Sequence, residues 1–224
     1  MIILDTEGEE FVLENAFDIA VPVHVEQFQG ETKIFAYPCV AELCTEYEKR
    51  YAEDLFCDEA LDFLRAGCTT FCQTNGYIEE KHPKNWGYNF LCSENTPNEE
   101  ISCERIRRDG KYKNLTTFDI AQCLAYERVI FAIVNEGQIV SAAVTSEAPQ
   151  KGADWVEIGT ETAVGYRGKG YAQATVRALS AFLTQKGYRV LYKCHHENLA
   201  SAAVARGAGF EEVGRFYYYV LRKD

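Results

Sequence analysis

Residues 163–172 read AVGYRGKGYA, and the segments on either side of this stretch decide the fold. Residues 155–164 alternate in polarity and are rich in β-branched side chains, which predicts a strand. Residues 171–187 place apolar side chains on one stripe at helical spacing, which predicts an amphipathic helix that ends at Gly187. The stripe consists of Ala172, Val176, Leu179 and Leu183. The glycine-rich stretch is therefore expected to form a loop between a strand and the first turn of a helix.

This loop combines several groups that favour anion binding. The first turn of a helix has backbone N–H groups without helical partners and carries the positive end of the helix dipole. Gly168 and Gly170 let an anion approach the backbone closely because they have no Cβ atom. Arg167 and Lys169 add positive charge beside them. Together these residues predict a turn that binds phosphate.

Two common nucleotide-binding patterns fit this loop poorly. A P-loop needs GxxxxGK followed by Ser or Thr, whereas Lys169 is followed by Gly170. A dinucleotide-binding GxGxxG loop would need a third glycine where Gln173 stands. A nucleotide-binding regulator stays an alternative if the loop prefers ATP or NAD to other phosphate ligands.

The rest of the second half has clear patterns. Residues 129–134 and 139–144 are predicted to form a hairpin, because the four residues between them read NEGQ. Residues 189–196 predict a further strand, and residues 198–207 predict a short helix with Asn198 in the capping position. Residues 210–221 predict one or two final strands. The predicted order is three strands, a helix, a strand, a helix and a last strand, which gives a mixed sheet in an α/β protein of the α+β type.

The first hundred residues have weaker patterns. Residues 9–17 and 21–28 are predicted short strands. Helical spacing follows Pro38, and a second helix is predicted over residues 58–66 with Gly67 as its stop. This part is expected to be mostly helical.

Charge separates the two parts of the chain. The net charge of −11 divides into −13 over residues 1–120 and +2 over residues 121–224. The chain therefore lacks the clustered basic charge of a nucleic-acid-binding protein. The acidity indicates either a solvated surface or the attraction of a cationic substrate. We expect an acidic extension over residues 1–100, which would form one wall of a substrate cleft, and a second domain over residues 101–224.

Composition limits the class of protein further. No apolar stretch approaches the roughly 18 residues of a membrane-spanning helix, and the acidic start MIILDTEGEE is not typical of a signal or transit peptide. A cytoplasmic protein without membrane contact is expected. The spacings of the cysteines match no disulfide framework or zinc site, so reduced core thiols and no metal are expected. They are Cys39, Cys44, Cys57, Cys68, Cys72, Cys92, Cys103, Cys123 and Cys194.

The pattern Arg-x-x-Gly-x-Ala at Arg167, Gly170 and Ala172 resembles the acetyl-CoA-binding signature of the GNAT N-acetyltransferases. Members of that superfamily also show an asparagine followed by a small residue three positions later and by Gly-Phe at offsets of eleven and twelve. The matching residues here are Asn198, Ser201, Gly209 and Phe210. The resemblance covers about residues 125–222. The sequence from Glu157 to Ala172 is similar to that of a bacterial subgroup with a long N-terminal extension.

The resemblance implies a sheet that splays between the strands near residues 155–164 and 189–196, with helices on its flanks. Coenzyme A would insert its pantetheine arm into that gap. The residues implied to bind acetyl-CoA or coenzyme A are Thr162, Val164, Arg167, Gly168, Lys169, Gly170, Tyr171, Ala172, Asn198 and Ser201. The acceptor would be the primary amine of a small molecule or peptide, and a homodimer is a further expectation.

The resemblance also implies catalytic roles. A glutamate on the third strand often removes a proton from the acceptor amine in this superfamily, which points to Glu157, the favoured residue, or Glu161. Many members have a tyrosine that protonates the leaving thiolate, but Ala205 stands at its position. Ser201, or a tyrosine of the run at residues 217–219, is the expected substitute. A non-catalytic acyl-CoA-binding module is therefore the alternative to an enzyme.

Overall fold

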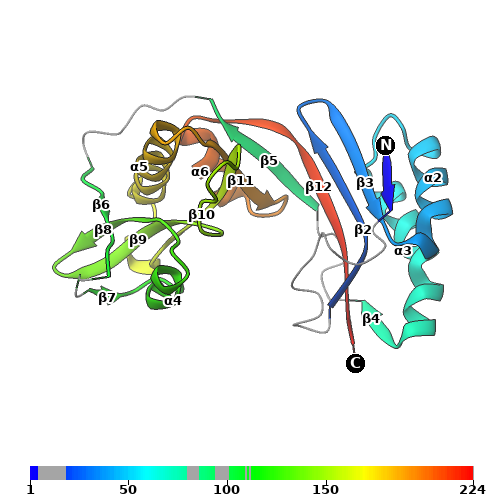
Figure 1. Ribbon diagram of the computed structural model, residues 1–224, viewed down its shortest axis with the longest axis horizontal. Helices are drawn as coiled ribbons and strands as arrows, with labels where there is room; N and C mark the ends of the chain where they lie inside the picture. The colour runs from blue at the N-terminus through cyan, green and yellow to red at the C-terminus, as the bar shows by residue number, and fades with distance from the viewer. Residues whose placement is uncertain (5–18, 80–85, 94–100, 109, 111, 224) are drawn as a thin grey trace. The chain divides into compact units, whose positions relative to one another are not determined.

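The computed structural model describes residues 1–4, 19–79, 86–93, 101–108, 110 and 112–223 (Figure 1). The described strands number twelve and include both parallel and antiparallel pairs. The chain divides into two compact units. The N-terminal unit is Met1–Tyr88 together with Val213–Asp224, and the central unit is Asn89–Glu212.

The N-terminal unit is a small sheet with helices. Its strands are β1 (Ile2–Leu4), β2 (Ile19–Phe28), β3 (Glu31–Ala36), β4 (Tyr77–Glu79) and most of β12 (Phe210–Lys223). Its helices are the 3-10 helix Pro38–Val40, α2 (Ala41–Arg50) and α3 (Asp58–Asn75). The strand order is β1-β3-β2-β12, and β4 pairs with β12. The expectation of a mostly helical extension is therefore wrong, because this unit is built on strands as much as on helices.

Helix α3 is twice as long as its sequence pattern predicts. The predicted stop, Gly67, lies inside the helix, where a Cβ atom would overlap the side chain of Leu43 in α2. The close packing of α2 and α3 therefore explains why a glycine stands at position 67. The helix ends instead at Gly76, which adopts a left-handed conformation with φ of 67°. The predicted strand at residues 21–28 is confirmed within β2, whereas residues 9–17 lie outside the described residues.

The central unit contains the elements that the second half predicts. Its strands are β5 (Trp86–Cys92, from Asn89 on), β6 (Glu104–Arg105), β7 (Lys113–Asn114), β8 (Ile130–Asn135), β9 (Gln138–Thr145), β10 (Trp155–Thr162) and β11 (Arg189–His195). Its helices are α4 (Ile120–Ala125), the 3-10 helix Val164–Tyr166, α5 (Tyr171–Gln185) and α6 (Leu199–Gly207). The strand order is β5-β11-β10-β9-β8-β6, with β7 beside β9.

Helices cover both faces of this sheet. Helix α5 buries Val176, Leu179 and Leu183 as predicted, and it packs across β8, β9 and β10. Helix α4 lies on the other face, where Cys123 joins a separate apolar cluster (Figure 1). The predicted hairpin of β8 and β9 turns through Glu136 and Gly137, which both have positive φ, as a two-residue turn of this type requires.

The sheet splays at the place that the resemblance implies. Parallel pairing of β10 with β11 ends where Ile158 lies opposite Tyr192. Strand β10 continues to Thr162, bonded to β9 on its other side, and β11 continues to His195. The gap between the two strands therefore opens toward the glycine-rich loop that follows β10.

Candidate active site

A cleft of about 590 Å³ occupies the splay of the central unit. It brings together the end of β10, the glycine-rich loop, the first turn of α5, one residue of β11 and the start of α6. Its lining residues are Thr160, Glu161, Thr162, Tyr166, Arg167, Gly168, Gly170, Tyr171, Ala172, Gln173, Tyr192, Asn198, Ala200, Ser201 and Val204. Most of the residues expected to bind the cofactor therefore line one cavity. Val164, Lys169 and Glu157 lie outside this lining.

The loop has the conformation that an anion site needs. Gly168 and Gly170 both have φ of 76°, in the region that strongly favours glycine. Gly170 is the N-cap of α5 and provides no side chain to cap it, so the first backbone N–H groups of the helix face the cleft's end without that partner. Arg167 lines the cleft and is held by a hydrogen bond from its Nε to the carbonyl oxygen of Thr162, at 3.0 Å. The Lys169 ammonium lies 5.1 Å from the centre of the Tyr166 ring.

These residues fit the pyrophosphate of coenzyme A. The cleft provides helix N-terminal amides, a guanidinium and two glycines without side chains at one end. Gly168 and Gly170 leave space around the positions where a Cβ atom would stand, with no heavy atom closer than the Ile101 side chain at 3.7 Å from Gly170. The same cleft is lined by Thr160 and Thr162 of β10 and by Tyr192 of β11, so it also reaches the unpaired part of the two strands, where the pantetheine arm would lie.

Asn198 and Ser201 contribute from the start of α6. Asn198 accepts a hydrogen bond from the Ser201 backbone N–H at 3.0 Å, so it caps the helix as well as lining the cleft. The Ser201 hydroxyl lies 2.8 Å from the hydroxyl of Tyr192. Tyr192 therefore reaches across from β11 to α6 at the closed end of the splay.

Sequence reasoning missed Tyr192. Tyr192 is only 2% exposed. Burial raises the pKa of its phenol, and the hydrogen bond with Ser201 partly offsets this rise. No local pattern marks Tyr192, because its place in the site depends on the contact between its hydroxyl and Ser201 of another element.

Of the two predicted glutamates, only Glu161 lines the cleft. Its Oε2 accepts a hydrogen bond from the Thr117 backbone N–H at 2.7 Å and another from the Thr117 hydroxyl. Asn114 holds this turn, since its amide donates to the carbonyl of Phe118 at 2.6 Å and its Oδ1 accepts from Thr116. Thr117 and Asn114 are positioning residues that no sequence pattern indicated.

Glu157 lies on the closed side of the splay. It stands opposite Leu191 in the paired part of β10 and β11, and its Oε1 is 3.4 Å from the Ser146 hydroxyl. His195 and His196 also lie outside the lining of the cleft. Tyr217 and Tyr219 are buried in the apolar core of the N-terminal unit.

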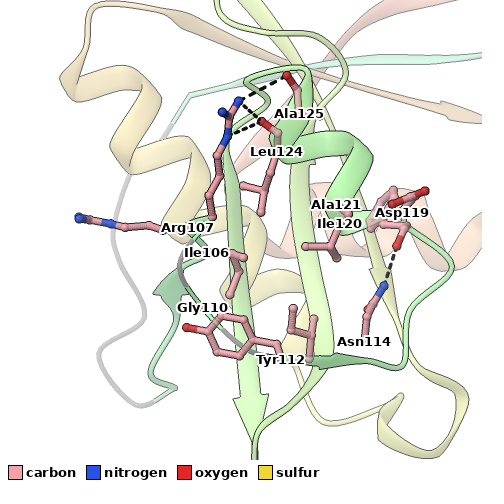
Figure 2. A pocket seen from close by; sticks show the side chains of 13 residues that line it. Ile106, Arg107, Gly110, Tyr112, Asn114, Asp119, Ile120, Ala121, Leu124 and Ala125 are labelled. Carbon is pink, nitrogen blue, oxygen red and sulfur yellow. Dashed lines mark hydrogen bonds between the residues drawn. The ribbon is translucent and has the colours of Figure 1, made fainter.

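A second cavity, of about 720 Å³, lies beside the Asn114 turn in the central unit. Figure 2 shows it between α4, which contributes Ile120 and Leu124, and the chain around Ile106 and Tyr112. Its charged lining residues are Arg107, Arg108 and Asp119. The Asp119 carboxylate already caps α4 through the Gln122 backbone N–H, at 2.9 Å.

Two classes of site find no support within the described residues. There is no group of three or more His, Cys, Asp and Glu side chains arranged to hold a metal ion. No helix in this part of the chain combines the length and apolar character that crossing a membrane would need.

Comparisons with known proteins identify the family of the chain. The family described as "Acetyltransferase (GNAT) domain" matches residues 78–211, which is more than half of the chain. A GNAT-family protein from Novosphingobium aromaticivorans superposes with a TM-score of 0.52 at 12% identity, covering 67% of this chain and 69% of that one. A GNAT acetyltransferase from Colwellia psychrerythraea gives 0.47 at 14% identity, over 67% and 60% of the two chains. A comparison with curated proteins finds no match. The chain therefore belongs to the GNAT superfamily of N-acetyltransferases.

Proposed function

We propose that the protein transfers an acetyl group from acetyl-CoA to a primary amine by direct attack on the thioester. The observation that carries this proposal is that the glycine-rich loop and the unpaired ends of β10 and β11 line one cleft. The loop from Gly168 to Ala172 would hold the pyrophosphate, assisted by Arg167. Thr162 and Asn198 would lie along the pantetheine arm, and acetyl-CoA would supply the activated acetyl group.

Glu161 is the base in this proposal. An alkyl amine with a pKa near 10.4 is only about one part in 10³ neutral at pH 7, so removal of its proton assists attack. The Glu161 carboxylate, fixed through one oxygen by Thr117, would accept that proton. The amine nitrogen forms a bond to the acetyl carbon, and the carbon–sulfur bond then breaks.

Tyr192 and Ser201 are the proposed general acid, which protonates the leaving thiolate. Their two hydroxyls lie at the closed end of the cleft, and the raised pKa keeps the Tyr192 phenol protonated at neutral pH. Ser201 would give its hydroxyl proton to the departing sulfur and take the phenol proton of Tyr192, so that coenzyme A leaves as the thiol and solvent returns a proton to Tyr192. The pair would perform the role of the tyrosine that Ala205 replaces.

The acceptor would reach Glu161 from the second cavity, because both adjoin the turn at residues 114–118 (Figure 2). Two arginines line that cavity, and its one acidic residue is engaged in a helix cap. We therefore propose a primary amine with an apolar body. The one carboxylate of this lining caps a helix, so in place of the earlier expectation of a cationic acceptor we propose no positive group beyond the reacting amine itself.

The test has two stages. Thermal unfolding is measured with acetyl-CoA, coenzyme A, ATP and NAD for the wild type, Gly170→Glu and Gly170→Ala. Ligand at about 100 times its dissociation constant should add about 2.7 kcal/mol of stability. Gly170→Glu should lose this effect through charge repulsion, whereas Gly170→Ala reports the backbone strain alone. Release of free thiol from acetyl-CoA is then followed with a panel of primary amines.

The outcomes separate the candidate functions. Stabilisation by both CoA species together with amine-dependent thiol release supports the proposal. Stabilisation without thiol release for any amine would favour the non-catalytic acyl-CoA-binding module. Stabilisation by ATP or NAD alone would contradict the assignment of the cleft.

A further inference from the structure

Four arginines line a pocket of about 430 Å³ in the central unit, which adjoins the 720 Å³ cavity and shares Arg107 and Arg108 with it. They are Arg105, Arg107, Arg108 and Arg128. Glu127 is the one acidic residue of the same lining. Such a concentration of positive charge is unexpected in a chain with a net charge of −11, because the guanidinium groups repel one another unless an anion lies among them.

Two of the arginines have structural contacts that account for them. The Arg105 guanidinium lies 4.7 Å from the centre of the Phe182 ring on α5. Arg108 donates hydrogen bonds to the last carbonyl groups of α4, to Leu124 at 2.9 Å and Ala125 at 3.5 Å. It therefore stabilises the C-terminus of that helix.

The other two arginines retain donors. The Nε atom of Arg128 is buried and has no hydrogen-bond partner among the described residues. The backbone around Arg128 is fixed after α4, since Glu127 adopts a left-handed conformation (φ of 57°) and the Arg128 backbone N–H donates to the Cys123 carbonyl. Arg107 is exposed, and Figure 2 shows it extending away from the other labelled side chains. Arg128 is half-buried as a residue, but a buried donor nitrogen without a partner is costly, so a ligand that accepts from it would be stabilising.

This pocket is distinct from the cofactor loop. It adjoins Phe182 near the C-terminal end of α5, whereas the loop precedes Tyr171 at the N-terminal end. Eleven residues of helix separate the two positions, which corresponds to about 17 Å. An anion in this pocket is therefore not the pyrophosphate that the cleft is proposed to hold.

We infer that the arginine pocket binds an oxyanion with at least two negative charges, of the phosphoryl class. Guanidinium groups pair with phosphate oxygens through two parallel hydrogen bonds, and several arginines around one group favour a dianion over a monocarboxylate. The inference does not depend on acetyl transfer. It concerns a second ligand, free or part of a larger molecule, that the cofactor cleft does not account for.

The experiment follows the arginine side chains directly. Signals of the Nε–Hε groups are recorded by ¹H–¹⁵N NMR on the full chain while inorganic phosphate is added at constant ionic strength. Single variants Arg107→Gln and Arg128→Gln assign the two signals. Both signals should shift in a saturable manner with one dissociation constant, and sodium acetate should shift them far less. Either variant should weaken binding at least about tenfold, the loss expected for one charge-assisted hydrogen bond.

The controls separate this site from other causes. A control variant that combines Lys33→Gln with Lys151→Gln removes two positive charges, where each arginine variant removes one, from exposed positions outside the pocket. It should leave phosphate binding unchanged. The exposed Arg107→Gln variant keeps the test valid if Arg128→Gln does not fold. Shifts confined to Arg167, or equal weakening by the lysine control, would overturn the inference. Equal shifts with phosphate and acetate would show nonspecific attraction and would also overturn it.

Discussion

At the scale of single residues, the two glutamates of β10 differ through the geometry of the sheet. Glu157 and Glu161 lie four residues apart, so an undistorted strand points both to the same face. The splay begins after Ile158, and only Glu161 stands in the open part. The sequence therefore predicts the pair, but the choice between them depends on where the strand pairing ends, which no local pattern records.

The first prediction concerns this choice. Glu161→Gln should lower kcat by about 10²-fold or more, because it removes the proton acceptor, while Glu157→Gln should stay within a few-fold of the wild type. Steady-state kinetics with the best amine of the panel measures both, and thermal unfolding verifies that each variant folds. A large loss in Glu157→Gln with normal turnover in Glu161→Gln would transfer the role to Glu157.

Tyr192 carries the second prediction. Tyr192→Phe should lower kcat about 10- to 100-fold with little change in KM for acetyl-CoA, because the lost hydroxyl acts on the leaving sulfur. Burial raises the pKa of this phenol above its ordinary value of about 10, so the donor stays protonated throughout the neutral and mildly alkaline range. Wild-type activity should therefore show no loss from this group below pH 10. A variant that changes KM alone would indicate a packing role.

At the scale of elements, the strands and helices after residue 128 follow from sequence patterns because each pattern coincides with local burial. Helix α5 presents one apolar stripe, and the β8–β9 hairpin has a glycine in its turn. Helix α3 shows the limit of such reasoning. A glycine such as Gly67 often ends a helix, but here it lies inside α3 because Leu43 of α2 leaves no space for a side chain. That contact is tertiary, so the local sequence does not show it.

A third prediction tests backbone packing between β2 and β12. A Cβ atom on Gly214 would overlap the backbone carbonyl of Gln27, which cannot move as a side chain can. Gly214→Ala should therefore lower the free energy of unfolding by about 3 kcal/mol or more, as overpacking and backbone strain add. Gly159→Ala, in β10 with open space around its Cβ position, is the matched control and should change little. Urea unfolding of both variants makes the comparison, and equal stability would contradict the packing.

At the scale of the whole molecule, the reactivity of each thiol is expected to depend on whether it lies in the core or at the surface. None of the nine cysteines forms a disulfide within the described residues, and Cys39 is exposed whereas Cys44 is buried. Burial raises the pKa of Cys103 to about 11 and that of Cys44 to about 12. At pH 8 their thiolate fractions would be about 10⁻³ and 10⁻⁴, so a thiol reagent should modify Cys39 first. Mass mapping of the modified peptides measures the order, and early modification of Cys44 would contradict its burial.

The division of the chain into units was the least predictable feature. The sequence suggests an extension over residues 1–100, since no familiar pattern occurs there. The compact N-terminal unit ends at Tyr88 and also contains the chain from Val213 on. Its core combines Val23 and Val25 of β2 with Tyr217 and Tyr219 of β12. Only pairing between the two ends of the chain reveals this unit, and such long-range pairing leaves no local signal.

The last prediction follows from that pairing. A fragment of residues 101–224 would keep β12 without β2 and β4, so the apolar side chains of Tyr217, Tyr219 and Leu221 would lose their cover. The backbone of the strand would also lose its hydrogen-bond partners and present an edge for pairing with other chains. We expect this fragment to aggregate during gel filtration at concentrations where the full chain does not. A fragment of residues 89–212 omits those side chains and should aggregate less. If residues 101–224 instead elute as a folded monomer, β12 does not depend on the N-terminal strands and the two-ended unit would be incorrect.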